Sequence, residues 1–204
     1  MMKNKRRRPK TMGLFALFRE DLQAWKRLGF LGGSPHAPVT LVDGIKLYWN
    51  YTGVRATFLY RLSHWCYRQR IPLIPSILWR RTIRRWGLDI VPSVPIGPGL
   101  YVAHPVGTVV MARGLGRNVS LITGITVGMR NSHEFPLIGN NVTIGAGARV
   151  LGGIVVADGA TIGANAVVID DVPPGVTMVG IPAKPVGQRT ARYTRPIEEV
   201  SYGS

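Results

Sequence analysis

The chain has 204 residues, with 26 Lys or Arg against 10 Asp or Glu and a formal net charge of +16. That length allows one compact unit, or two small ones, with a proper hydrophobic core. The single cysteine, Cys66, excludes an internal disulfide framework and fits a reducing cytoplasm, and the lack of a long apolar run predicts no bilayer-spanning segment.

The positive charge lies almost entirely in the first half of the chain. Residues 1–88 contain 18 Lys or Arg and 3 acidic residues, whereas residues 89–204 contain 8 and 7. Such a field attracts nucleic acid, anionic lipid or an acidic polymer. No nucleic-acid recognition motif or zinc-ligand spacing accompanies it, so we expect no nucleic-acid partner.

In chain order, residues 1–12 form a basic tail and residues 13–88 form a predicted helical region. Apolar and charged positions alternate at helical spacing over residues 13–28, which indicates an amphipathic helix. A linker rich in Gly and Pro follows, and residues 43–70 predict one or two helices with an aromatic face. Residues 71–79 are a short apolar segment, after which four arginines are spaced to line one side of a helix: Arg80, Arg81, Arg84 and Arg85.

Two interpretations of the aromatic residues in this basic half remain open. Rings and cations together suit attachment to a membrane surface, where apolar groups are buried and cations meet lipid phosphates. Alternatively, the aromatic rings pack the helices against one another or cover the open end of the solenoid predicted next.

Residues 89–188 are dominated by a period of six. From residue 138 onward, six consecutive six-residue units each open with Ile or Val, at Ile138, Ile144, Val150, Val156, Ile162 and Val168. This period fits neither an α-helix nor a hairpin, but it fits a solenoid in which three short strands make one coil. The leading aliphatic residues then form a continuous core. The predicted fold class is therefore mainly β, a hexapeptide-repeat solenoid with an N-terminal α-helical region.

The same pattern extends upstream and is interrupted once. The upstream leading positions are Val109, Leu115, Leu121 and Val127, with Ile96 and Val102 one register earlier, so the solenoid is predicted to run from about residue 89 to about residue 180. Between Val127 and Ile138 the spacing is eleven residues, so residues 128–137 should form a loop that protrudes from a corner of the coil. Loops on a rigid scaffold often carry function. A last strand is predicted at residues 176–180, and residues 189–204 are predicted to be a tail.

Several of these segments resemble one family. Residues 60–65, 89–107, 145–154, 163–168 and 180–187 are similar to the serine acetyltransferases of the hexapeptide-repeat acyltransferase superfamily. Similar patterns occur in the colanic acid and other exopolysaccharide O-acetyltransferases. The resemblance implies a left-handed parallel β-helix, a homotrimer with active sites between subunits, acetyl-CoA as the donor and no metal.

The resemblance also implies a catalytic pair. In this family a histidine at the position of His104 takes the proton from the acceptor hydroxyl, and an aspartate at the position of Asp89 orients that histidine. Neutral imidazole, with an ordinary pKa of about 6.5, is suited to this proton transfer. The two residues are fifteen positions apart, nearly one coil, so they can converge at a corner. The backbone N–H of Gly128 is a candidate for stabilising the oxyanion.

The same comparison suggests how coenzyme A is held. Backbone groups at the positions of Ala146 and Ala164 lie beside the cofactor arm in the family. Lys184, with Arg189 or Arg192 beyond it, is placed to meet the phosphates.

Two positions depart from the serine acetyltransferase pattern. The family typically has an Asp immediately before the catalytic histidine and an Arg-His pair in the extruded loop, and these groups recognise the amino acid. Here Ala103 precedes His104, and Glu134-Phe135 stands in place of the pair. Arg130 and His133 lie nearby and are candidates for the substrate loop. The acceptor is therefore L-serine, giving O-acetylserine for cysteine synthesis, or a sugar hydroxyl in glycan assembly.

Two other classes of protein fit the sequence less well than an acetyltransferase. A zinc-dependent carbonic anhydrase on the same scaffold needs three histidines, but only His104 and His133 of the four lie in the solenoid. A non-catalytic solenoid would present a flat surface to a partner, with the basic half as its anchor. We expect a cytoplasmic enzyme, with peripheral contact at the inner face of the membrane through the basic half as a further expectation.

Overall fold

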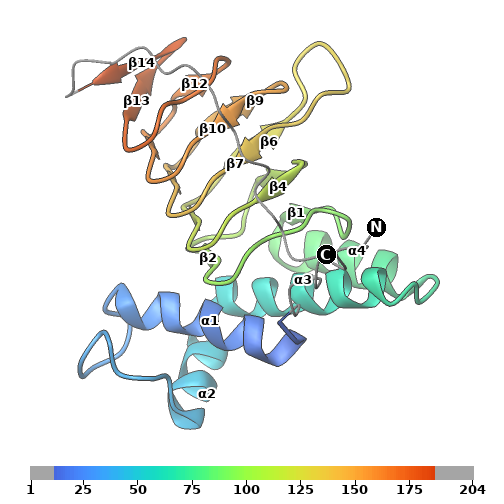
Figure 1. Ribbon diagram of the computed structural model, residues 1–204. Helices are drawn as coiled ribbons and strands as arrows, with labels where there is room; N and C mark the ends of the chain where they lie inside the picture. Colours follow the sequence, from blue (N-terminus) through green and yellow to red (C-terminus); the bar gives the residue numbers. More distant parts are fainter. Residues whose placement is uncertain (1–11, 187–204) are drawn as a thin grey trace, which may run out of the picture.

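The computed structural model describes residues 12–186, in which four helices lead into a parallel β-solenoid (Figure 1). The predicted tails at residues 1–12 and 189–204 lie outside these residues, apart from Met12. No helix of the described part has the length and apolarity needed to cross a bilayer.

The helices are α1 (Leu14–Arg27), α2 (Leu41–Asn50), α3 (Thr52–Arg68) and α4 (Ile74–Trp86). Helix α2 begins with a reciprocal capping box, in which Thr40 Oγ1 accepts from the Asp43 N–H and Asp43 Oδ2 accepts from the Thr40 N–H. The Thr40 N–H and then the ammonium of Lys26 hold the pKa of Asp43 down to about 2. The sequence therefore encodes the start of this helix locally.

Helix α4 corrects one prediction. Residues 71–79 were expected to be an apolar segment separate from the arginine-rich helix, but most of this segment forms the first turns of α4. Pro75 is compatible with that place because the first turn of a helix has no partner for its backbone N–H groups. The helix ends at Gly87, which adopts the left-handed conformation (φ 67°).

The solenoid is built from three stacks of very short strands. A five-stranded sheet has the order β1 (Leu88–Ile90), β3 (Thr108–Val110), β6 (Thr126–Gly128), β9 (Arg149–Leu151) and β12 (Val167–Val168). A three-stranded sheet contains β4 (Gly114–Leu115), β7 (Leu137–Ile138) and β10 (Val155–Val156). A six-stranded sheet contains β2 (Tyr101–Val102), β5 (Ser120–Leu121), β8 (Thr143–Ile144), β11 (Thr161–Ile162), β13 (Thr177–Gly180) and β14 (Ala183–Val186).

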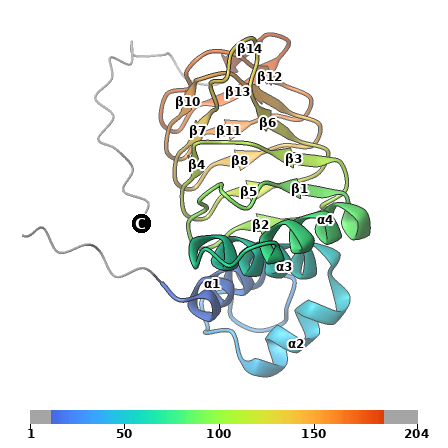
Figure 2. The ribbon, with the colours of Figure 1, turned by 90° about the vertical axis from the view of Figure 1, so that its right-hand side faces the viewer.

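These stacks form the three sides of the coil, as Figure 2 shows. All strand pairs are parallel except that of β13 with β14. The leading aliphatic residues of the six predicted units are each at most 1% exposed and belong to one core cluster: Ile138, Ile144, Val150, Val156, Ile162 and Val168. The predicted fold class is confirmed, and the period of six is the repeat that fills the interior.

The register was wrong at one upstream position. The residue that points inward in β3 is Val110, which is fully buried and pairs with Val127, whereas the predicted Val109 is only half-buried. The step from Val102 to Val110 is eight residues because the turn between β2 and β3 is longer than a regular corner. This enlarged corner carries His104.

The interruption of the repeat is a loop, as predicted. It leaves the solenoid after β6 and returns at β7, and Figure 1 shows it protruding from the coil in yellow. Arg113 ties its far end to the scaffold, because Arg113 Nε donates to the Phe135 carbonyl at 3.1 Å and the Arg113 N–H donates to the Pro136 carbonyl at 2.9 Å.

Helices α1 and α3 cover the open first coil. The Trp25 ring meets the Tyr101 ring of β2 edge-on at a centroid distance of 4.7 Å, and Tyr60 Oη donates to the Val94 carbonyl at 2.7 Å. The interpretation that aromatic residues cap the solenoid therefore holds for these rings. Others stay outside: Phe15 is 79% exposed and Trp49 is 71% exposed.

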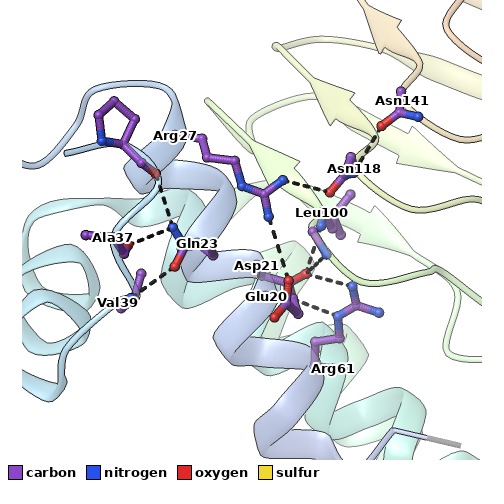
Figure 3. A network of polar contacts seen from close by, with 12 residues as sticks. Glu20, Asp21, Gln23, Arg27, Ala37, Val39, Arg61, Leu100, Asn118 and Asn141 are labelled. Carbon is purple, nitrogen blue, oxygen red and sulfur yellow. Dashed lines mark hydrogen bonds and ion pairs between the residues drawn. The ribbon is translucent and has the colours of Figure 1, made fainter.

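A buried ion pair joins the same two helices to the coil (Figure 3). Arg61 of α3 donates from Nε and Nη2 to the two carboxylate oxygens of Asp21 of α1, at 2.8 and 2.9 Å. Asp21 Oδ1 also accepts from the N–H groups of Gly99 and Leu100. Burial raises the pKa of Asp21, and the guanidinium of Arg61 opposes that rise. One carboxylate thus connects α1, α3 and the turn before β2.

Gly53 of α3 lies close against the backbone of the solenoid, and its replacement by Ala is expected to be destabilising. A Cβ at residue 53 would lie 1.9 Å from the carbonyl oxygen of Val102, so backbone would have to move. We expect a loss of about 1–3 kcal/mol in the free energy of unfolding, measured by urea denaturation. The control is Gly44→Ala in helix α2. The added Cβ would lie 3.4 Å from Leu22 Cδ1, which is an ordinary van der Waals contact. Equal stability of the two variants would contradict close packing at Gly53.

Candidate active site

The predicted catalytic and donor-binding residues gather along one edge of the solenoid. This edge, here called the His104 edge, consists of the turns that lead from the six-stranded sheet into the five-stranded sheet: residues 103–107, 122–125, 145–148 and 163–166. Successive turns are hydrogen-bonded, since the Gly124 N–H donates to the Val106 carbonyl and the Gly147 N–H donates to the Thr123 carbonyl. The turns are therefore stacked in a fixed register.

His104 occupies the first of these turns with its backbone held and its side chain exposed. Its N–H donates to the Ile122 carbonyl at 2.9 Å, and the N–H of Ala103 donates to the Leu121 carbonyl at the same distance. The imidazole thus projects from a rigid turn toward solvent, where an acceptor hydroxyl can reach it.

Asp89 lies on β1 beside this turn. Leu88 and Ile90 are buried on either side of it, so alternation along the strand turns the carboxylate outward. The start of β1 touches the His104 turn, because a Cβ on Gly87 would lie 3.2 Å from Cα of Val106. The structure therefore brings Asp89 and His104 to one edge, but no hydrogen bond joins their side chains in the described residues.

Asp89 instead accepts a hydrogen bond that the sequence did not suggest. Trp79 of α4 donates from Nε1 to Asp89 Oδ1 at 2.8 Å. Ten residues separate the two, and only the bend between α4 and β1 brings them together. The indole orients the carboxylate and leaves its Oδ2 without a partner in the described part of the chain.

The donor-binding candidates extend from His104 along the edge. Ala146 and Ala164 lie in the third and fourth turns and are half-buried and exposed, respectively. Gly107, Gly124 and Gly147 also occur on this edge with positive φ, and no large side chain projects from these glycine positions. Arg149 binds the carbonyls of Gly124 and Gly147 and so keeps the turns in place.

Lys184 stands at the far end of the six-stranded sheet. It lies on β14, paired with Val179 of β13, and its side chain is exposed. Five strand spacings of about 4.8 Å separate β2 from β14, which is about 24 Å. Arg189 and Arg192, the other predicted phosphate-binding residues, lie outside the described residues.

Gly128, Arg130 and His133 lie at a different edge. They sit at or beyond the carboxyl end of β6, whereas the His104 turn precedes the amino end of β3. Because β3 and β6 are parallel neighbours, their amino and carboxyl ends lie on opposite edges of the sheet. Within one chain, the loop and the predicted catalytic pair are therefore separated by the width of the five-stranded sheet.

The loop packs against its own coil. Glu134 lies over Gly153, where an added Cβ would stand 3.0 Å from Glu134 Cβ, and Glu134 Oε2 accepts from Ser132 Oγ at 3.3 Å. The side chains of Arg130 and His133 are exposed.

The remaining histidines have other environments. His64 Nδ1 lies 2.8 Å from the Pro92 carbonyl, which only accepts, so this nitrogen carries the proton. Burial lowers the pKa of His64, so this histidine is a neutral structural group. Among residues 12–186, no three His, Cys, Asp or Glu side chains are grouped as metal ligands would be.

The comparisons with known proteins agree with this architecture. The model of the bacterial transferase hexapeptide (six repeats) family matches residues 135–170, which lie within the solenoid. The serine acetyltransferase of Helicobacter pylori strain J99 is 39% identical over 140 residues, which cover 67% of this chain and 82% of that protein. The chain belongs to the serine acetyltransferase family.

Other relatives extend the likeness to solved structures. The serine acetyltransferase of Synechococcus elongatus is 36% identical over 146 residues, and the match spans 70% of this chain but 60% of that relative. Soybean serine acetyltransferase complexed with serine superposes with a TM-score of 0.73 at 34% identity, covering 85% of this chain and 69% of that one. A serine acetyltransferase in complex with CoA gives the same TM-score at 29% identity, covering 85% and 69%.

Proposed function

We propose that this protein is an acetyl-CoA-dependent O-acetyltransferase that acts on a hydroxyl acceptor, with L-serine as the first candidate and O-acetylserine as its product. The observation that supports the proposal is the position of Asp89, on the strand whose start touches the turn that carries His104, in a serine acetyltransferase scaffold. The exposed imidazole is accessible to an acceptor, and the carboxylate beside it is already oriented by Trp79.

The proposed reaction needs one proton transfer in each direction. The imidazole of His104 takes the acceptor O–H proton while that oxygen attacks the thioester carbonyl carbon. The resulting oxyanion is stabilised by backbone N–H donors, for which Gly128 of a neighbouring subunit is our candidate. When the carbon–sulfur bond breaks, the thiolate of coenzyme A leaves and receives the proton from the imidazolium. Asp89 stabilises the imidazolium that forms in between.

The donor is proposed to lie along the His104 edge. Small residues at Ala146 and Ala164 allow an extended arm to approach the backbone closely, and Lys184 at the far end offers a cation to the phosphates. Arg189 and Arg192 are retained as proposed additional cations. The solved relative in complex with CoA supports acetyl-CoA as the donor.

A homotrimer with sites between subunits is proposed to complete this arrangement. Within one chain, Gly128, Arg130 and His133 lie at the edge opposite His104, so they cannot cover the imidazole of their own chain. A neighbouring subunit packed around a three-fold axis would bring the loop of one chain to the His104 edge of another. This supports Arg130 and His133 as acceptor-binding residues acting across an interface.

The alternative acceptor is a sugar hydroxyl of an exopolysaccharide. It is favoured by Ala103 and Glu134-Phe135, which replace the ionic groups that the family uses to hold an amino acid. A charge-assisted hydrogen bond contributes about 1.5–3 kcal/mol, so losing such contacts weakens serine binding unless Arg130 or His133 replaces them.

An acceptor screen tests both readings. CoA release from acetyl-CoA would be measured with L-serine, with D-serine and L-alanine as matched controls, and with free sugars and oligosaccharides. We expect release above the hydrolysis background with L-serine, absent with L-alanine, which has no hydroxyl. Release only with saccharides would move the acceptor to the alternative. If none of the hydroxyl compounds raised CoA release above the hydrolysis background, the O-acetyltransferase assignment would be contradicted.

We also propose that the enzyme works in the cytoplasm, with peripheral contact at the inner face of the membrane through its basic half. The support is the charge, because residues 1–88 carry 18 Lys or Arg against 3 acids.

A further inference from the structure

We infer that the groove between α1 and α2 is the docking surface for an anionic phospholipid bilayer. This inference rests on the peripheral membrane contact proposed above and names its site, its lipid chemistry and its orientation.

The groove is an apolar cleft in the helical region. It has a volume of about 560 Å³ and is lined mainly by apolar side chains of α1, α2 and α3, including Phe15, Phe18, Leu22, Ile45, Tyr48 and Phe58. Gly44 of α2 lies opposite Leu22 of α1, where an added Cβ would be 3.4 Å from Leu22 Cδ1, so the two helices are in close contact below it. The groove is therefore bounded on one side by the contact between α1 and α2.

Helix α2 carries an apolar face beside this groove. Leu41 is 81% exposed, Val42 59%, Ile45 51% and Trp49 71%. At 100° per residue, these side chains and Tyr48 cover about one third of the helix circumference. Only Leu47 of this helix is buried. An apolar face that the fold leaves in water, bordered by Trp and Tyr, matches a helix lying in a membrane interface.

The net positive charge of the helical region favours an anionic bilayer as the binding partner of the groove. Residues 12–88 contain 12 Lys or Arg and 3 acids. Each of the three acids is bound to a cation inside the region, in the pairs Lys26–Asp43, Arg27–Glu20 and Arg61–Asp21. The helical region thus keeps a net positive charge, and two exposed cations flank the apolar surface, Arg19 in the groove lining and Lys46 on α2.

The sequence before α1 adds to this charge. Residues 1–11, which precede the described residues in the sequence, contain six further Lys or Arg. A second copy of the chain would bring the same positive charge to the groove, which disfavours self-association there. Anionic headgroups around a hydrocarbon interior complement both the cations and the apolar face.

Docking through α1 and α2 would place the reaction near the membrane. These helices lie at the end of the molecule opposite β13 and β14 (Figure 1). Trp25 of α1 contacts Tyr101 of β2, and His104 follows β2 by two residues. The first coil, with its candidate catalytic corner, is therefore the part of the solenoid closest to the bilayer, which favours an acceptor presented at a membrane surface.

Vesicle flotation with the full chain tests the docking surface. We expect binding to vesicles of phosphatidylcholine with about one third phosphatidylglycerol, weaker binding in high salt, and little binding to phosphatidylcholine alone. The double variant Leu41→Ser/Ile45→Ser should lower the partition coefficient at least about tenfold, since burying one such side chain already shifts an equilibrium by about that factor. The matched control is Ile77→Ser on α4, 55% exposed in the same basic half, which should bind as the wild type does.

Three results would overturn the assignment: no wild-type binding to anionic vesicles, unchanged binding of the double variant, or an equal loss in Ile77→Ser. Sedimentation velocity tests whether a second copy of the chain occupies the groove instead. If the wild type did not bind vesicles and the double variant changed its oligomeric state, the groove would be an interface between copies. The His104→Ala variant separates this inference from the proposed function. It should bind vesicles normally while failing to transfer acetyl groups.

Discussion

Replacing His104 by Ala is expected to abolish acetyl transfer while leaving the fold intact. A positioned general base contributes about 10²–10⁴-fold to a rate, so turnover should fall by at least that range. The side chain is exposed and its backbone is held by main-chain hydrogen bonds, so the free energy of unfolding should change by less than about 0.5 kcal/mol. The measurement is CoA release with the best acceptor of the screen, alongside urea unfolding.

The matched control is His36→Ala, because His36 is exposed in the segment between α1 and α2 and takes no part in the proposed chemistry. Its turnover should equal that of the wild type. If His104→Ala retained turnover within about twofold, His104 would not be the general base and the proposed mechanism would fail.

Replacing Asp21 by Ala is expected to be the most destabilising single change in the helical region. The substitution leaves the guanidinium of Arg61 buried at 1% exposure without its carboxylate, and it leaves the N–H groups of Gly99 and Leu100 without their acceptor. Removing one partner of a buried ion pair costs about 3–5 kcal/mol. Urea denaturation followed by circular dichroism measures this loss.

The neighbouring Glu20→Ala is the control, because Glu20 pairs with Arg27 at 3.7 Å and both side chains are at least one third exposed. Its cost should be below about 1 kcal/mol. The double variant Asp21→Ala/Arg61→Met should recover part of the loss, since no unpaired charge remains inside. A loss for Asp21→Ala as small as for Glu20→Ala would show that Asp21 does not hold the helices to the first coil.

The position of Asp21 explains why its replacement should also lower turnover at the candidate active site. Gly99 and Leu100 directly precede β2, and the His104 turn directly follows it. A loosened turn before β2 would shift the imidazole relative to Asp89. We therefore expect reduced turnover in Asp21→Ala even at temperatures where the variant remains folded.

Much of the solenoid was predictable because its repeat is local. Each six-residue unit places its leading aliphatic residue inward by the same geometry, so one register from Ile138 to Val168 identified six buried positions. The prediction failed at Val109 because the step from the buried Val110 to Leu115 is five residues instead of six, and a period cannot report a residue missing from a turn. The same applies to α4, where an apolar segment and an arginine-rich segment proved to be one helix.

The candidate site was predictable only in part. Resemblance indicated Asp89 and His104, and the coil length indicated that they meet. Trp79 was not foreseen, because its bond to Asp89 depends on the angle at which α4 joins β1 rather than on any spacing. The placement of Arg130 and His133 at the opposite edge was also unforeseen, since the repeat counts residues along the chain and does not say which corner a loop leaves.

Periodicity and composition are properties of the chain, so they were sufficient to predict the β-solenoid, the interruption after β6 and the concentration of positive charge in the helical half. The packing of the elements fixes the corner that carries each candidate residue. It also fixes which aromatic rings cap the first coil and which remain exposed on α2. These outcomes depend on how separate elements pack. A contact such as Asp21 with Arg61 or Trp79 with Asp89 forms only when the folded chain brings distant surfaces together.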